Sequence, residues 1–395
     1  MHKSAMILLC AILLHVDLLA QTHSMTDILQ SIERNNYALK ALRTSIEQQN
    51  LENQASNNLP DPELDFYYLP IKPEEAPYNY SELEFRQSFE FPTVYAMRKK
   101  WIDKEAMVLE SQYAKKKQEV LLPAQQLLVE ISSLNKKKFI EAKRLEQSQT
   151  ILSHLTTQFE KGAIGVLELN KAKIAWMQDQ FAIDQIDLKI RKASMELTKM
   201  NSGLAIAADQ FMLEDDFEMD SYDQIWKEKQ SLDPELTILQ QEEAASLQNL
   251  KVARHKLLPN LTLGYNSQGV RDDVYSGVFA GISIPLWSTR NKVKIAKSNV
   301  NLQALNAKAE LMKAEIKLKE QFETYALLKK KHAEYEKTLG SLNSEQLLYQ
   351  AFEQGEYSFA EYFVELQFYR EAINQKLDLE QELNELKASI LIYKL

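Results

Sequence analysis

The sequence contains very little glycine. Nine of its 395 residues are glycine, roughly 2% of the chain against an average near 7%. Because glycine is a frequent helix terminator and turn residue, this scarcity favours long helices. Cysteine is scarcer still. Cys10 is the only one, which excludes a disulfide framework and a zinc site built from cysteines.

Long hydrophobic runs and an excess of basic residues are also missing. After the first twenty residues, no segment approaches the run of about 18 apolar residues that indicates a transmembrane helix. The formal net charge is −9, which argues against a nucleic-acid partner. No phosphate-binding loop, dinucleotide-binding turn, zinc-protease helix or nucleophile elbow occurs. The sequence therefore predicts no enzyme, no cofactor and no metal site, and its histidines, such as His154, His255 and His332, stand alone.

The first twenty residues have the pattern of a cleavable signal peptide. A basic start at Lys3 precedes an apolar run over 5–14, and the small residue Ala20 comes just before a polar stretch. The run is too short for a spanning helix, which needs about 20 apolar residues. Cys10 lies inside the run without the small residue that precedes a lipidated cysteine. We therefore expect residues 1–20 to be an export signal.

Proline is concentrated in two short windows, at about 60–92 and 259–287. Eight of the ten prolines lie there or at the edges of these windows. The sequence elsewhere is rich in Ala, Leu, Glu, Lys and Gln, which are good helix formers. The predicted order is helix, strand hairpin, long helices, strand hairpin, long helices.

The first window contains a predicted strand over 82–91, in which polar and apolar residues alternate. Its partner is predicted at 63–69, and the two are joined by a loop containing Pro70, Pro73 and Pro77. A period of two residues indicates a strand with one polar and one apolar face. The polar face carries Glu82, Glu84, Arg86, Ser88 and Glu90, and the apolar face carries Leu83, Phe85, Phe89 and Phe91.

The second window predicts another hairpin, from 260–268 and 276–284. These strands are about ten residues long, the length of a transmembrane β-strand, and aromatic residues gather near the strand ends. A small soluble β-domain would give the same local pattern, so the windows alone leave both interpretations open. The apolar face carries Leu261, Leu263, Tyr265, Val278, Ala280, Ile282 and Ile284.

The chain contains an internal repeat with a displacement of 193 residues. Phe91-Pro92 and Ile284-Pro285 end the two strand hairpins at this displacement. A later group, Leu155, Phe159, Glu160, Gly162 and Glu168, recurs at the same displacement as Leu348, Phe352, Glu353, Gly355 and Glu361. One fixed register over so many positions indicates two tandem copies of one structural unit.

Each copy predicts a long helical hairpin. The segment from the strand-ending proline to the later glycine has 70 residues, about 105 Å of helix at 1.5 Å per residue. Pro123 is expected to bend the first such helix and Gly340 to loosen the second. Gly162 and Gly355 are expected at the tips of the hairpins, where a left-handed residue ends a helix. Further helices are predicted at 25–59, 166–201, 233–258 and 359–394.

These features together resemble the TolC-type outer-membrane efflux proteins. Besides the repeat and the two glycine tips, the resemblance rests on four short segments. They are Asn36-Tyr37-Ala38-Leu39, Asp233-Pro234-Glu235-Leu236, Leu258-Pro259-Asn260-Leu261 and Ile284-Pro285-Leu286. The resemblance covers the whole mature chain, divided into a first repeat at 21–202, a linker or equatorial segment at 203–232 and a second repeat at 233–395.

The resemblance implies a mainly α-helical fold with a small β portion. Long coiled-coil hairpins form a helical barrel in the periplasm, and four transmembrane strands per protomer close as a trimeric 12-stranded β-barrel. Four strands alone cannot close a barrel, and lipid does not tolerate an open sheet edge. Eight strands would leave an interior just filled by side chains, whereas twelve give a wider bore. Glu82, Glu84, Arg86 and Glu90 would line this bore.

The implied function is passive conduction across the outer membrane within a tripartite efflux or secretion system. The implied partners are a periplasmic adaptor of the membrane-fusion type, an inner-membrane pump of the RND or ABC type, outer-membrane lipid and two further copies of the chain. The cargo stays open. Drugs, metal ions and secreted peptides all remain candidates, since a duct need not bind what it conducts.

The resemblance places adaptor docking and gating at the tips, at 155–169 and 348–362. Glu168 and Glu361 are the gate candidates, and Val364 stands where family members have a second acid, which predicts a weaker acidic ring. A glutamate after a turn is otherwise commonly a solvated helix face. The docking candidates are Leu155, Phe159, Gly162, Gly165, Leu348, Phe352, Gly355 and Tyr357.

Two other classes of protein compete with the channel. A periplasmic coiled-coil adaptor or scaffold would explain the helices, although both strand hairpins occupy equivalent points of a repeat. An enzyme on a helical scaffold would require a catalytic group that the motifs do not provide.

Overall fold

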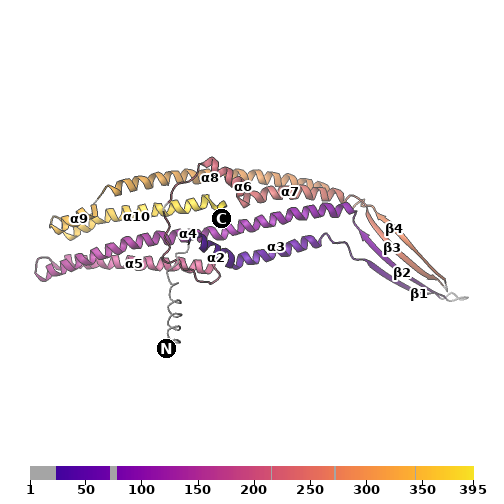
Figure 1. Cartoon of the computed structure of the whole chain (residues 1–395), viewed down its shortest axis with the longest axis horizontal. Coiled ribbons are helices and arrows are strands. Elements are labelled where there is room, and N and C mark those ends of the chain that lie inside the picture. The colour runs from indigo at the N-terminus through magenta and orange to yellow at the C-terminus, as the bar shows by residue number, and fades with distance from the viewer. Residues whose placement is uncertain (1–23, 72–77, 215, 271–272, 343) are drawn as a thin grey trace, which may run out of the picture. The chain divides into compact units, whose positions relative to one another are not determined.

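The computed structural model describes residues 24–71, 78–214, 216–270, 273–342 and 344–395. The expected signal peptide and most of the proline-rich loop lie outside these residues. The described chain is mostly helical, with one small sheet (Figure 1). The helices are α2 (Met25–Asn35), α3 (Tyr37–Ala55), α4 (Pro92–Glu160), α5 (Val166–Met200), α6 (Tyr222–Leu232), α7 (Pro234–His255), α8 (Lys292–Gly340), α9 (Ser344–Glu353) and α10 (Phe359–Ile390), and η1 (Ile392–Lys394) is a short 3₁₀ turn.

Most predicted helices are confirmed, and the first is divided. The sequence predicts one helix over 25–59, but Asn36 separates α2 from α3. The Asn36 side-chain oxygen accepts hydrogen bonds from the backbone N–H groups of Ala38 and Leu39 at 3.0 and 3.1 Å. Asparagine in this role caps the start of a new helix, so a local hydrogen bond ends the continuous run.

The two long outgoing helices also differ from each other. α4 runs through Pro123 without ending. The second outgoing segment is divided, because α8 ends at Gly340 and α9 begins at Ser344. α7 begins as expected, with the Asp233 carboxylate accepting from the backbone N–H of Glu235 at 2.9 Å and Pro234 in the first helical turn. The segment at 203–232, expected as a linker, contains α6.

The chain forms two compact units, and each contains segments of both repeats. The tip unit comprises the described residues up to Lys40 and those within Lys117–Ile225 and Lys317–Leu395. The sheet unit comprises Ala41–Lys116 and Trp226–Ile316.

Among the described residues, the tip unit contains apolar cores at two places. One joins α2, α4 and α5 through side chains such as Ile32, Leu128 and Leu197, all fully buried. The other lies at the hairpin ends and includes Leu155, Leu169 and Tyr362. In the sheet unit, Val108 of α4 packs with Ile238 and Ala245 of α7.

All four described strands belong to one antiparallel sheet with the order β1-β2-β3-β4. They are β1 (Glu63–Ile71), β2 (Tyr78–Phe89), β3 (Asn260–Val270) and β4 (Asp273–Ser283). The two hairpins join through β2 and β3, where Phe85 pairs with Tyr265. Both predicted hairpins are therefore confirmed, and they form a single surface.

None of the described helices combines the length and the apolarity needed to cross a membrane.

Candidate functional site

The sheet has one polar and one apolar face. The β2–β3 register places Glu82 opposite Gln268, Glu84 opposite Asn266 and Ser88 opposite Thr262. Since side chains alternate along a strand, these residues share one face. The register with β1 adds Glu63 and Asp65 to the same face, opposite Arg86 and Glu84.

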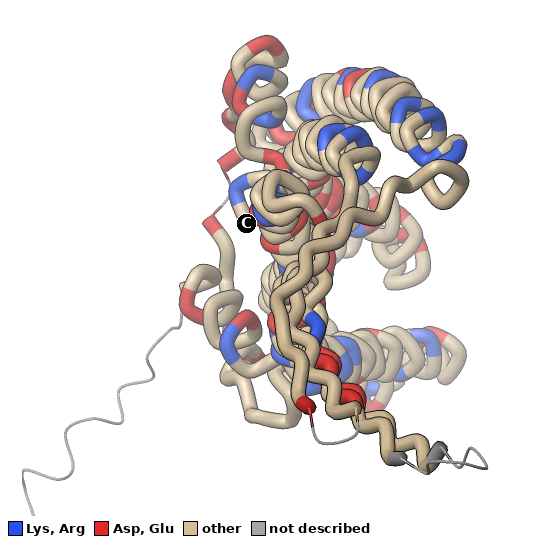
Figure 2. The backbone as a smooth tube through the Cα atoms, turned by 90° about the vertical axis from the view of Figure 1, so that its right-hand side faces the viewer, with Lys and Arg blue, Asp and Glu red and all other residues tan. Residues whose placement is uncertain are grey.

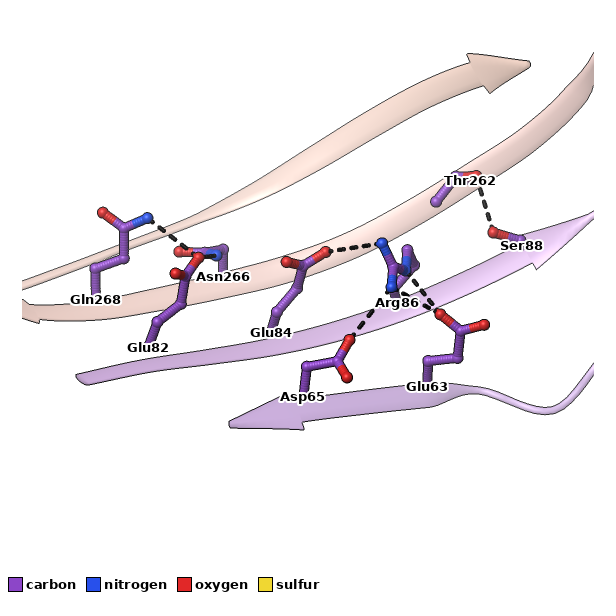
Figure 3. Close-up of polar contacts among 9 residues, drawn as sticks. All are labelled: Glu63, Asp65, Glu82, Glu84, Arg86, Ser88, Thr262, Asn266 and Gln268. Carbon is purple, nitrogen blue, oxygen red and sulfur yellow. Dashed lines mark hydrogen bonds and ion pairs between the residues drawn. The ribbon is translucent and has the colours of Figure 1, made fainter. Parts of the chain in front are cut away.

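Arg86 lies among three carboxylates on the polar face (Figure 3). Its guanidinium approaches Glu63 at 2.8 Å, Asp65 at 3.2 Å and Glu84 at 3.6 Å. Two of these acids come from the neighbouring strand β1, so the cluster ties β1 to β2. Exposed ion pairs are weak singly, but here one cation serves three acids.

Glu82 has a different set of partners, and all of them are uncharged. One of its carboxylate oxygens accepts from the amide of Asn266 at 2.5 Å and from that of Gln268 at 3.3 Å (Figure 3). The other accepts from the Tyr80 hydroxyl at 2.5 Å. These partners were not predicted from the sequence, although Asn266 and Gln268 alternate in β3 as the acids do in β2.

Glu90 does not belong to the polar face. β2 ends at Phe89, and the Glu90 carboxylate forms an ion pair with Arg98 in α4. The prediction that Glu90 continues the strand is wrong. The alternation of polar and apolar residues continues to Phe91, two residues beyond the end of β2, and α4 begins at Pro92. Glu82, Glu84 and Arg86 lie on the polar face as predicted.

The opposite face of the sheet is apolar and exposed. Val278 is 87% exposed, and Leu64 and Phe66 are about two-thirds exposed. Leu263 pairs with Ala280 in β3 and β4 on this face. Monomeric soluble proteins rarely leave a contiguous apolar surface of this kind uncovered.

The two predicted tips have matching backbone geometry. Gly162 and Gly355 have φ values of +75° and +77°. The N–H of Gly162 donates to the carbonyl of Phe159, and that of Gly355 to the carbonyl of Phe352, at 2.9 and 3.0 Å. The next N–H group in each tip reaches back five residues, which completes a Schellman motif. The repeat is thus preserved in the hydrogen bonds of the tips.

The predicted docking residues divide into buried and exposed groups. Leu155 is buried in the tip core, and Leu348 and Phe352 pack against it. Phe159 and Tyr357 are more than one-third exposed. Gly165 lies at the N-cap of α5 without a side-chain cap.

The two gate candidates, Glu361 of α10 and Glu168 of α5, both accept hydrogen bonds from backbone N–H groups at the start of α10. Glu361 forms a capping box with Ser358, accepting from its backbone N–H at 2.9 Å and from its hydroxyl at 2.8 Å. These bonds, the backbone one first, lower the pKa of Glu361. Glu168 of α5 accepts from the backbone N–H of Phe359 at 3.2 Å. Both acids therefore satisfy N–H groups at one helix start, where negative charge is favourable.

A buried ion pair below this helix start was not predicted. Arg370 of α10 donates two hydrogen bonds to Asp179 of α5, at 2.7 and 3.3 Å, and both residues are more than nine-tenths buried. Asp179 follows Leu169, Ala172 and Ala175 at helical spacing. An acidic residue on the apolar face of a predicted helix indicates a buried charge that needs a partner, so the sequence did contain a sign of this ion pair.

Aromatic side chains also contribute to this core. Tyr362 stacks on Phe352 with ring centroids 5.1 Å apart. Burial raises the pKa of Tyr362 to about 12, so its phenol is neutral at physiological pH. Phe359 stacks on Phe363 at 5.9 Å.

Among the described residues, no group of three or more His, Cys, Asp or Glu side chains could hold a metal ion.

No protein-family model and no curated protein matches this sequence. Solved structures do match over nearly the whole chain. CusC, described as forming a transmembrane channel, has a TM-score of 0.76 at 15% identity, covering 93% of this chain and 91% of its own. The Campylobacter jejuni outer membrane channel CmeC has a TM-score of 0.68 at 14% identity, covering 93% and 85%. The Vibrio cholerae outer membrane protein VceC has a TM-score of 0.67 at 13% identity, covering 94% of each chain. The chain therefore has the fold of these proteins.

Proposed function

We propose that this chain, which has the fold of outer-membrane channel proteins, is the outer-membrane channel of a tripartite efflux or secretion system and works as a homotrimer. The observation that carries the proposal is the unfinished sheet, with an exposed apolar face, a polar face and two edges. Within the described residues, β1 and β4 each pair on one side only. An unpaired edge exposes backbone groups that must be satisfied elsewhere.

Lipid outside and water inside account for both faces of such a sheet. The apolar side chains, Val278 at 87% exposed among them, would meet the hydrocarbon region. The carboxylates and Arg86 would line a water-filled bore. Closed barrels are the only sheets that satisfy every backbone group in lipid.

The number of copies follows from the size of the bore. Each chain supplies four strands. Two copies would give eight strands and a bore just filled by side chains, whereas three would give twelve and an open bore. Three is also the number that the family resemblance implies.

The sheet unit carries a second surface that fits another copy of the chain. Five apolar residues of α8 are each more than half exposed, and their spacings of 7, 3, 7 and 4 residues put them all at the a and d positions of a coiled-coil heptad. They are Ile295, Leu302, Leu305, Met312 and Ile316. A seam of this kind requires a partner helix. We assign it to a neighbouring protomer, because the sheet of the same unit also needs copies to close.

The tips are proposed to dock a periplasmic adaptor, which would link the channel to an inner-membrane RND or ABC pump. Exposed apolar side chains support this assignment. Leu167 is 75% exposed and Val166 53%, beside the first tip, and Leu347 is 61% exposed near the second. Energy for transport would come from the pump, so the chain itself acts as a passive duct.

Glu168 and Glu361 are proposed as gate residues because both bind the start of α10. Opening a gate there would require their hydrogen bonds to rearrange. In single-channel records, Glu361→Ala is expected to change the block by polyvalent cations applied from the tip side. Unchanged block would remove Glu361 from the gate and leave the channel proposal intact.

Fractionation followed by planar-bilayer recording tests the function. The protein is expected in the outer membrane, extractable only with detergent, and the purified species is expected to insert as discrete conductance steps. A chain that extracts without detergent and gives no conductance would instead be a periplasmic adaptor or scaffold. Turnover that single polar substitutions abolish without affecting assembly would indicate an enzyme.

A further inference from the structure

The base of the second strand hairpin, where β3 and β4 meet the helices, carries only positive charge. α7 leads into β3 and α8 follows β4, and the pairing of Asn260 with Ser283 brings these two ends of the hairpin together. The segments 251–262 and 284–307 contain seven cations and no acid. The cations, called here the cationic base, are Lys251, Arg254, Lys256, Arg290, Lys292, Lys294 and Lys297. Figure 2 looks onto the sheet and shows Lys and Arg on the helix ends behind it.

The internal repeat shows that this charge is not general to the junctions between strands and helices. Lys104 of the first copy lies between two acids, Asp103 and Glu105. Its counterpart at the displacement of 193 is Lys297, which lies between uncharged residues. The segment that leads into the first hairpin, 47–62, has three acids and no cation. The positive charge is therefore specific to the second hairpin.

Most of these cations have no counter-charge within the described part of the chain. Lys256 is the one member with a described ion pair, to Glu90 at 3.9 Å, and the other six are exposed. α8 has no acid in its first turn, where Lys292 and Lys294 lie. Cations at a helix start oppose the helix dipole and repel one another. An anion bound to the cationic base would offset both unfavourable effects.

An exposed apolar surface lies directly beside the cationic base. Ile284, Leu286 and Trp287 follow β4 and are all more than half exposed. They continue from the apolar face of the sheet, to which Ile282 belongs. Tryptophan, with an apolar ring and one polar N–H, is enriched where hydrocarbon meets lipid headgroups. The change from apolar to cationic surface thus follows the change from acyl chains to headgroups in a membrane.

We propose that the cationic base binds the phosphate groups of anionic phospholipids, in the membrane leaflet that lies next to the helices. The inference rests on the proposed function, because it requires that the sheet span the membrane. Clustered lysines and arginines beside a membrane attract acidic lipids, and arginine can hold a phosphate through two hydrogen bonds. A lipid fits this surface better than a soluble anion, since it also covers the apolar side chains next to the cations.

Lipid binding to the wild-type oligomer is the first test. The full-length protein, freed of lipid in a neutral detergent, is titrated with phosphatidylglycerol or with phosphatidylcholine. Native mass spectrometry counts the bound lipids, and heating gives the temperature at which the oligomer dissociates. Phosphatidylglycerol should bind preferentially and raise this temperature, whereas inorganic phosphate at the same concentration should not. The preference should shrink near 1 M salt, where the screening length is about 3 Å.

A fourfold variant removes the cations of α8 and should lower the affinity for phosphatidylglycerol at least about tenfold. Its substitutions are Arg290→Gln, Lys292→Gln, Lys294→Gln and Lys297→Gln.

The matched control removes four exposed cations further along the same helix, where acids are interspersed, and should keep the wild-type affinity. Its substitutions are Lys308→Gln, Lys313→Gln, Lys317→Gln and Lys319→Gln. Lys251→Gln with Arg254→Gln tests the α7 side of the surface independently and should weaken the same lipid.

The outcomes separate this inference from the proposed function. A wild-type channel that conducts but binds both lipids equally would overturn the inference alone, as would a fourfold variant that keeps the preference. A fourfold variant that dissociates more easily in lipid-free detergent would assign the cations to acids of a neighbouring copy, and would also overturn it. A wild-type protein that never enters a membrane would overturn the proposed function itself.

Discussion

At the scale of single residues, the tip unit contains a buried ion pair formed by Asp179 and Arg370. Both side chains are buried, and the guanidinium donates to both carboxylate oxygens. Such a pair contributes little net stability compared with apolar residues, but removing one partner leaves a buried charge without compensation. Its role is therefore best measured by removing the partners singly and together.

Asp179→Ala is expected to destabilise the folded chain by about 3–5 kcal/mol, because Arg370 loses its carboxylate. The double variant Asp179→Ala with Arg370→Leu should recover most of this loss. The free energy of unfolding of each variant is measured by denaturant titration in detergent, monitored by circular dichroism. Glu334→Ala, which removes the exposed partner of Lys331, serves as the control and should leave the midpoint unchanged. A double variant as unstable as the single one would contradict this account.

The capping box at Ser358 predicts a dependence on pH. The pKa of Glu361 lies below its ordinary value of 4.5, first because of the Ser358 backbone N–H and then because of its hydroxyl. A lowered pKa means that the ionised carboxylate stabilises the fold above the ordinary pKa, and that this is lost as pH falls through the lowered value.

Amide exchange in the first turn of α10 measures this effect. After correction for intrinsic rates, protection at Tyr362 should be constant between about pH 7 and 5 and should fall below the ordinary carboxyl pKa. Glu361→Gln should remove this change with pH. Protection that falls equally in both proteins would mean that another group titrates.

The sequence revealed much, but not all, of the chemistry at this scale. Alternation in β2 was enough to place Glu82, Glu84 and Arg86 on one face. Their partners depend on the pairing of β2 with β3, which lie far apart in the chain, so alternation within one strand could not identify Asn266 or Gln268. The Ser358–Glu361 box did have a local signal, a serine three residues before a glutamate.

At the scale of elements, β3 approaches its neighbouring strands very closely at Gly264. Gly264 of β3 faces the ring of Phe279 and the carbonyl of Phe85. A Cβ atom added there would lie 2.3 Å from the ring and 2.6 Å from the carbonyl oxygen. The Phe85 oxygen belongs to the backbone of β2, so it cannot move without disturbing the sheet.

Gly264→Ala is therefore expected to destabilise the sheet by about 1–3 kcal/mol, the usual cost of overpacking. Gly277→Ala is the matched control, because a Cβ at Gly277 meets no atom within 4 Å. The yield of detergent-extracted oligomer and its temperature of dissociation compare the two. An equal loss of oligomer yield and dissociation temperature in both variants would show that replacing any glycine in these strands is harmful, whether or not the added Cβ has a close neighbour.

The apolar face provides a second test of the sheet. Val278→Lys puts a charge on the proposed lipid face, where lysine costs about 2–4 kcal/mol near the bilayer midplane. Gln268→Lys puts the same charge on the polar face and should be tolerated. The amount of protein in the outer membrane measures both variants. Equal accumulation of the two would contradict the assignment of the faces.

The helices show where sequence patterns stop being sufficient. The repeat located both tips, and α5 and α10 begin where predicted. The break at Asn36 was hidden because asparagine is tolerated within a helix, and only its hydrogen bonds to Ala38 and Leu39 identify it as a cap. Gly340 was recognised as a weak point, but propensity alone does not decide between a loosened helix and an ended one.

At the scale of the whole molecule, the tandem repeats and the compact units divide the chain differently. Each predicted repeat comprises a helix, a strand hairpin and a long helical hairpin with its tip, whereas each compact unit collects equivalent parts of both repeats. One unit holds both strand hairpins and the other holds both tips. This arrangement accounts for the single sheet of four strands and for the shared tip core, neither of which a single repeat could form.

The central claim is that one chain cannot complete its sheet and that three chains together can. The most direct test is the mass of the detergent-extracted membrane species, measured by native mass spectrometry. The expected mass is three times that of the mature chain, with dissociation to single chains on heating. A monomer that stays in solution without detergent would contradict it.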